Sequence, residues 1–120
     1  MQYIISGLIM LVIDIIYLSL TGHEFTGMVK KIQKSPFAMR MSGAITSYIL
    51  MILGLNTFII REKKTPMDAA ILGLVIYGVF DAVNYAIFSK YDLLIALKDT
   101  FWGATLFYVT TYLTYKISKM

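Results

Sequence analysis

Apolar residues fall into four long runs along the chain, and short polar segments separate these runs. They cover about residues 2–20, 41–60, 69–88 and 93–115. Each run is close to the roughly 20 apolar residues that a helix needs to cross the hydrocarbon core of a bilayer. The pattern therefore predicts an all-α fold, a four-helix transmembrane bundle, with residues 1–120 forming a single integral membrane domain.

The first run carries one charged residue, Asp14, and no basic residue at its start. It is followed by Thr21-Gly22-His23-Glu24, whereas a secretory signal peptide ends in a cleavage site of small residues. We therefore expect this run to be a retained transmembrane helix.

Residues 22–38, between the first two runs, combine lysines with apolar residues at helical spacing. The apolar positions are Phe25, Met28, Val29 and Ile32, and the lysines are Lys30, Lys31 and Lys34. This pattern favours a short amphipathic helix that lies in the membrane interface. The alternative is a solvated loop.

Composition supports a membrane location. Of the 120 residues, 58% are hydrophobic and 15% are charged, and the mean hydropathy is +0.72. Soluble domains have about 45–50% apolar and about 25% charged residues, so a soluble monomer and a disordered chain are excluded. The chain has no cysteine, which excludes disulfides and thiolate metal sites. We expect a multi-pass protein of a cellular or viral membrane.

The net charge of +4 comes from basic residues that lie mostly at the ends of the apolar runs, as membrane anchors do. They do not alternate with aromatic residues, so a nucleic-acid partner is not expected. The expected partners are the lipid bilayer and either a second copy of the chain or another membrane protein.

The positive-inside rule assigns no orientation, because basic residues are almost equally divided between the two sides. Arg61, Lys63, Lys64, Lys116 and Lys119 fall on the side of the chain ends, and Lys30, Lys31, Lys34, Arg40, Lys90 and Lys98 fall on the opposite side.

Three acidic residues, Asp14, Asp81 and Asp99, lie inside the apolar runs. A rise of about 1.5 Å per residue places each of them about 9–12 Å from the same side of the membrane. The second run brings the polar stretch 46–48, which includes Ser47, to the same depth. A carboxylate at the bilayer centre costs at least about 2.5–3.5 kcal/mol, so such residues normally face the bundle interior. The sequence therefore predicts one polar layer.

Each of the three aspartates has a hydrogen-bond donor one helical turn away on the same helix face. The pairs are Tyr17 with Asp14, Tyr77 and Asn84 with Asp81, and Trp102 with Asp99. The candidate cavity residues are therefore Asp14, Asp81, Asn84 and Asp99, and the candidate supporting residues are Tyr17, Ser47, Tyr77 and Trp102.

The leading functional interpretation is a carboxylate-lined cavity that binds or passes protons, cations or a small cationic solute. Three carboxylates without a basic residue among them repel one another and are poorly hydrated, so the layer needs a positive partner or water. The alternative is a structural or interaction membrane protein whose polar layer only locks the helices together. An intramembrane enzyme or a lipid-binding module is the third and least favoured interpretation.

The sequence contains no glycine-rich phosphate loop and no serine nucleophile elbow. Its single histidine, His23, has no cluster of further metal ligands around it in the sequence. We therefore expect no catalytic residue, no metal site and no cofactor.

Three motifs resemble a known family. They are Asp14 in the first run, Tyr77-Gly78-Val79-Phe80-Asp81-Ala82-Val83-Asn84 in the third, and Asp99-Thr100-Phe101-Trp102-Gly103 in the fourth. The chain resembles the small membrane proteins grouped as domain of unknown function 2177. The resemblance implies a four-span membrane protein with relatives in bacteria and in some large DNA viruses. It implies no established biochemical activity.

Overall fold

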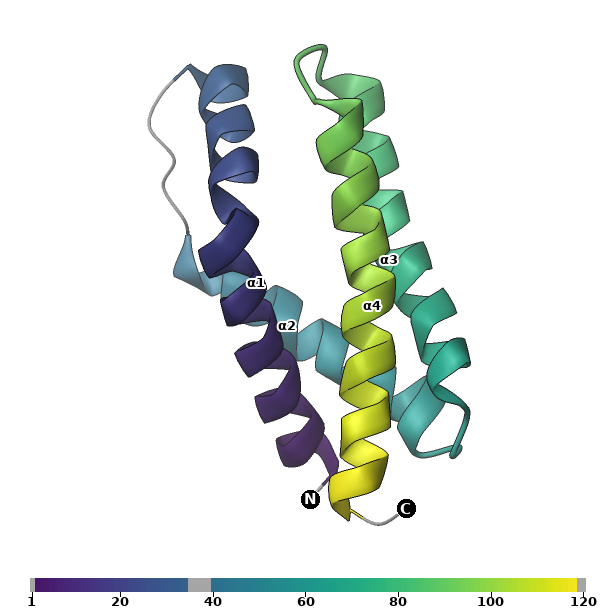
Figure 1. The fold of residues 1–120 in the computed structure, drawn as a ribbon. Coiled ribbons are helices and arrows are strands. Elements are labelled where there is room, and N and C mark those ends of the chain that lie inside the picture. The colour runs from purple at the N-terminus through teal and green to yellow at the C-terminus, as the bar shows by residue number, and fades with distance from the viewer. Residues whose placement is uncertain (1, 35–39, 119–120) are drawn as a thin grey trace.

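The computed structural model describes residues 2–34 and 40–118, and almost all of them are helical (Figure 1). The elements are α1 (Gln2–Gln33), α2 (Met41–Leu55), η1 (Asn56–Ile60), α3 (Pro66–Ile87) and α4 (Leu93–Ser118). η1 is a π-helical turn that continues α2, in which the Arg61 amide donates to the Asn56 carbonyl at 2.9 Å. The predicted all-α bundle of four helices is confirmed.

Three helices are long and apolar enough to cross a membrane: α1, α2 together with η1, and α3. With 26 residues, α4 extends about 39 Å at 1.5 Å per residue, so it also has the length of a span. It is more polar because it lies between α1 and α3 and packs against both (Figure 1). Its buried residues include Thr110, Thr111 and Thr114, which the bundle rather than lipid surrounds.

The amphipathic segment predicted between the first two spans is helical through Gln33, but it continues α1 without a break. The expectation of a separate interfacial helix is therefore wrong for the described residues, and residues 35–38 of that prediction lie outside them. No proline interrupts the chain before residue 36. The apolar face instead packs within the protein: Met28 forms a small core with Tyr91 and Ala96.

The two ends of the bundle differ, and Figure 1 shows both. The terminal end carries both chain termini and residues 61–65, and the turn end carries the end of α1 and the α3–α4 turn at residues 88–92. α2 crosses the bundle obliquely and begins about halfway along α1, so only α1, α3 and α4 extend to the turn end. The main core lies toward the terminal end and consists of Met10, Leu55, Ile59, Ile60, Ala69, Leu106 and Phe107.

Helices α3 and α4 approach each other closely at two glycines. A methyl group on Gly73 would overlap the backbone carbonyl of Gly103, and a methyl group on Gly103 would overlap the ring of Tyr77. Small residues at a contact between membrane helices allow the backbones to come together and increase van der Waals packing. The α3–α4 hairpin is therefore the most closely packed pair of helices in the described part of the chain.

Candidate functional site

Asp14 joins three helices through its carboxylate. Tyr48 of α2 donates its hydroxyl to Oδ2, and Trp102 of α4 donates its indole N–H to Oδ1 at 3.0 Å. Asp14 on α1 is only 6% exposed, so these two donors replace the water that the carboxylate loses. The charge is thus buried with hydrogen bonds from neutral groups.

Asp81 joins α3 to α4 and to the turn between them. Tyr91 of the turn donates to Oδ1 at 2.8 Å, and Thr100 of α4 donates to Oδ2 at 3.1 Å. Asp81 is 2% exposed. Burial, and then the hydrogen bond to Asp81, raise the pKa of the Tyr91 hydroxyl, which therefore remains a proton donor. The Asn84 side chain also influences the Tyr91 hydroxyl, so Asn84 lies near the site.

Asp99 differs from the other two aspartates. It is half-buried, and its carboxyl group interacts electrostatically with those of Asp81 and Asp14. Within residues 2–34 and 40–118, no hydroxyl, indole or amide donor is paired with it. The three aspartates therefore interact with one another at the single depth that the sequence predicts, and Asp99 is the least satisfied of them.

Asp99 lines a pocket of 390 Å³ that all four helices form. The remaining lining is mostly apolar and consists of Leu18, Phe25, Ser47, Leu50, Met51, Ile76, Tyr77 and Phe80. The pocket lies on the turn-end side of the main core, beside the part of α2 that begins halfway along the bundle. A single carboxylate on an apolar, partly aromatic wall is the distinctive chemistry of this site.

The aromatic residues of the site have partners other than those predicted. Tyr17 does not bond to Asp14 but stacks on Trp102, with ring centroids 4.0 Å apart and planes 4° from parallel. Trp102 bonds to Asp14 and not to Asp99. Tyr77 packs over Gly103 and meets Phe107 edge to face. These rings hold the helices that carry the carboxylates.

Sequence reasoning missed three donors: Tyr48, Tyr91 and Thr100. Spacing along a helix identifies neighbours on one helix face, whereas these donors reach across from another helix or from the turn. Tyr48 lies in the polar stretch 46–48, from which Ser47 was selected. Ser47 is exposed, bonds to the Ala44 carbonyl of its own helix at 2.9 Å and lines the pocket.

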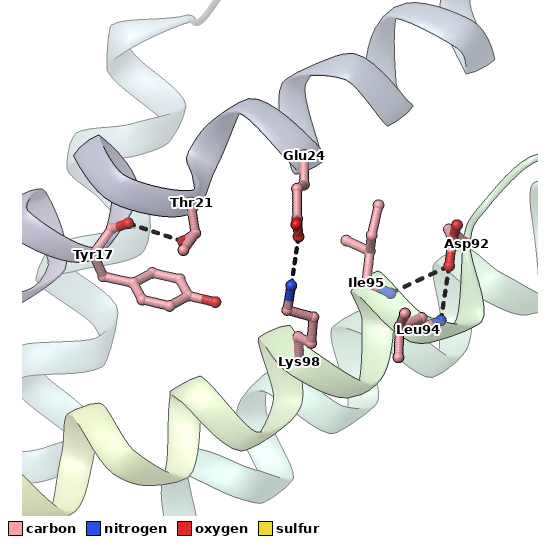
Figure 2. Close-up of polar contacts among 7 residues, drawn as sticks. All are labelled: Tyr17, Thr21, Glu24, Asp92, Leu94, Ile95 and Lys98. Atoms are coloured by element: carbon pink, nitrogen blue, oxygen red, sulfur yellow. Dashed lines mark hydrogen bonds and ion pairs between the residues drawn. The ribbon is translucent and has the colours of Figure 1, made fainter.

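The basic residue nearest to Asp99 in sequence, Lys98, is directed away from the site. It forms an ion pair with Glu24 of α1 at 2.7 Å, on the exposed surface (Figure 2). Figure 2 also shows Asp92 accepting from the backbone amides of Leu94 and Ile95 at the start of α4. Glu24–Lys98 is the only ion pair in the described part of the chain. No basic side chain there therefore neutralises Asp14, Asp81 or Asp99.

The three carboxylates do not form a chelating group. In the part of the chain that the structure describes, no three His, Cys, Asp or Glu side chains lie close enough together to hold a metal ion. His23 is exposed on α1.

Comparison with known proteins gives one finding. The model of a family described as "Predicted membrane protein (DUF2177)" matches residues 1–116. No curated protein and no solved structure matches the chain. The family description and the three apolar helices agree that this is an integral membrane protein.

Proposed function

The chain belongs to the DUF2177 family of predicted membrane proteins, and on that premise we propose that it binds a small lipophilic cation in the pocket lined by Asp99. A protonated amine with a compact apolar body is the chemical class that fits this pocket. The ammonium group would pair with the Asp99 carboxylate, and the apolar body would contact the surrounding side chains.

One observation carries the proposal: Asp99 lines the pocket, whereas Asp14 and Asp81 each already accept two hydrogen bonds from neutral donors. The volume of 390 Å³ lies within the roughly 300–1,000 Å³ typical of small-molecule sites. Such sites are mostly apolar and contain a few polar groups that fix the orientation of the ligand.

The chemistry of the wall favours a positive ligand. The carboxyl groups of Asp81 and Asp99 interact electrostatically, and two neighbouring carboxylates repel each other unless a proton or a cation lies with them. Phe25, Tyr77 and Phe80 supply aromatic faces, which attract an organic cation by about 0.5–2 kcal/mol each when they contact it. A proton on the carboxyl pair and a bound amine would therefore replace each other.

Binding is favoured over passage through a single chain. Met10, Leu55 and Leu106 are fully buried in the main core, on the terminal-end side of the carboxylates. Within one chain, these apolar side chains would separate the pocket from the buried polar side chains of the terminal end. We infer that any transport would need a second copy of the chain, with the pathway between protomers.

The test is the melting temperature of the purified protein in detergent with a panel of inorganic cations, quaternary ammonium ions and lipophilic amines. A ligand that binds only the folded state stabilises it by about 2.7 kcal/mol at 100 times its dissociation constant, so the midpoint must rise with concentration. Asp99→Asn should abolish the rise. Glu62→Gln, which removes an exposed carboxylate in the loop before α3, should retain it. A rise that persists in Asp99→Asn, or none with any compound, would overturn the proposal.

A structural role is the second candidate, and the paired donors on Asp14 and Asp81 favour it. In that case the carboxylates only join the helices, and the pocket is occupied by lipid chains. The same experiment separates the two functions, because a purely structural protein shows no ligand-dependent midpoint, while Asp14→Asn and Asp81→Asn still lower its stability.

A further inference from the structure

A second hollow lies at the turn end of the bundle, between the end of α1 and the α3–α4 turn. Its volume is 290 Å³, and it is lined by Ile32, Lys34, Ile87, Phe88, Ser89 and Lys90. Two lysines from distant parts of the chain thus face one space, together with a serine hydroxyl. None of these residues lines the pocket that contains Asp99.

The positive charge of this hollow is not neutralised by the protein. Within residues 2–34 and 40–118, neither Lys34 nor Lys90 forms an ion pair. The acidic residues of this end are otherwise engaged: Glu24 pairs with Lys98, and Asp92 accepts from the Leu94 amide at 2.8 Å. None of the described residues that line the hollow carries a carboxylate, so their charge complements an anion.

The rest of the lining is apolar and continues onto the outer surface of the bundle. Ile87 is 66% exposed and Phe88 is 39% exposed, at the point where α3 ends. The end of a membrane span lies at the level of the lipid headgroups. A ligand here would meet positive charge and a hydroxyl at one side and lipid-facing apolar side chains at the other.

We propose that this hollow binds the phosphate headgroup of an anionic phospholipid. The ammonium groups of Lys34 and Lys90 would hold the phosphate, the Ser89 hydroxyl would donate a hydrogen bond to it, and an acyl chain would lie along Ile87 and Phe88. Basic pockets between membrane helices recognise headgroups in this way. The apolar wall is the reason for assigning a lipid, because free phosphate would make no use of it. The site is independent of the proposed cation pocket.

The test measures lipid retention by the delipidated full-length protein in detergent, using native mass spectrometry. The probes are phosphatidylglycerol, phosphatidylcholine with the same acyl chains, and inorganic phosphate. We expect one phosphatidylglycerol per chain to bind about tenfold or more tightly than phosphatidylcholine, since each lysine near the headgroup contributes about 1 kcal/mol. Inorganic phosphate should not displace it at comparable concentration.

Matched double variants assign the site. Lys34→Gln/Lys90→Gln should lose most of the preference for the anionic lipid, while its melting temperature in detergent stays at the wild-type value because both side chains are exposed. Lys63→Gln/Lys64→Gln, at the terminal end, should retain the preference. The pairs are comparable, since Lys34 and Lys63 both have a positive φ, at 57° and 53°.

Three results would overturn the proposal: equal binding of the two lipids, an equal loss in both double variants, or displacement by inorganic phosphate. The second would indicate attraction by overall charge, and the third would indicate a phosphate site without a lipid. If this proposal fails, the proposal that the Asp99 pocket binds a cation is unaffected, because the two experiments use different ligands and different variants.

Discussion

The terminal and turn halves of the bundle use buried polar groups differently. Toward the terminal end the buried polar side chains are neutral: Asn56 donates to the Ser6 hydroxyl at 2.9 Å, and Thr114 donates to the Thr110 carbonyl at 2.6 Å. Toward the turn end the polar groups are three aspartates, and both hollows lie beside them or beyond them.

The path of α2 explains this difference. All four helical segments meet in the terminal half, where Leu55, Ile60 and Phe107 are fully buried. Because α2 begins halfway along α1, the turn half has one helix fewer (Figure 1), and both hollows lie toward this end. Close packing holds the terminal half together, whereas the proposed ligand sites both lie in the turn half.

The largest loss of stability is expected at the close approach of α3 and α4, a contact that both halves of the bundle depend on. In Gly103→Ala the added methyl group overlaps the Tyr77 ring and forces the helices apart, which should cost about 3 kcal/mol. The melting temperature in detergent measures this loss. Gly54→Ala is the matched control, because a methyl group there meets nothing within 4 Å, and it should leave the midpoint unchanged or slightly higher. Equal midpoints for the two variants would contradict the close approach.

The next largest loss of stability is expected when a carboxylate of the turn half that accepts two hydrogen bonds is replaced. Asp81→Leu leaves the hydroxyls of Tyr91 and Thr100 without their acceptor, and should destabilise the protein by about 2 kcal/mol. Asp81→Asn keeps an oxygen that accepts and should lose less. Thermal unfolding followed by circular dichroism compares the variants. If Asp81→Leu were as stable as wild type, Asp81 would have no role in holding α3, α4 and the turn together.

A smaller effect of opposite sign is expected in the terminal half. The Thr110 hydroxyl is fully buried and has no hydrogen-bond partner in the described part of the chain. Thr110→Val keeps the shape and removes the unsatisfied group, so the protein should gain about 1 kcal/mol of stability. Thr105→Val, at an exposed position on the same helix, is the control. A fall in melting temperature for Thr110→Val would show that this hydroxyl has a hydrogen-bond partner, such as a buried water. The terminal half would then contain water in its core.

The smallest effect is expected at the surface of the turn half. Glu24 and Lys98 are 40% and 45% exposed, so solvent screens their ion pair. Glu24→Gln should leave the melting temperature unchanged within error, at low and at high salt. A clear drop at low salt only would show that this pair fixes the position of α1 against α4.

Much of the fold was predictable because hydrophobic run length sets the helices directly. The predicted 41–60 span coincides with α2 and η1 together, and the Thr65–Asp68 capping box with Pro66 explains why α3 begins where it does. The continuation of α1 to Gln33 was not predictable from periodicity alone. The same apolar stripe suits a membrane interface or a neighbouring helix, and the contact of Met28 with Tyr91 decides between them.

The candidate site was predictable in depth but not in partners. Counting residues from the helix ends places Asp14, Asp81 and Asp99 at one level, and the structure brings them together. The donors depend on how each helix is rotated and on the conformation of the turn, which spacing along one helix does not determine. Tyr91 lies in the turn between α3 and α4 and is therefore the donor that a single sequence gives least reason to expect.

The central claim is that Asp99 binds the ligand whereas Asp14 and Asp81 stabilise the fold. The most direct measurement determines two quantities on the same samples of wild type, Asp99→Asn and Asp81→Asn. They are the melting temperature without ligand and the dissociation constant of the amine that gives the largest thermal shift. We predict that Asp99→Asn keeps or raises the melting temperature and binds the amine about tenfold or more weakly, since an interfacial charge loses its partner. Asp81→Asn should lower the melting temperature. The claim is contradicted if Asp99→Asn binds the amine as tightly as wild type, or if it loses as much stability as Asp81→Asn.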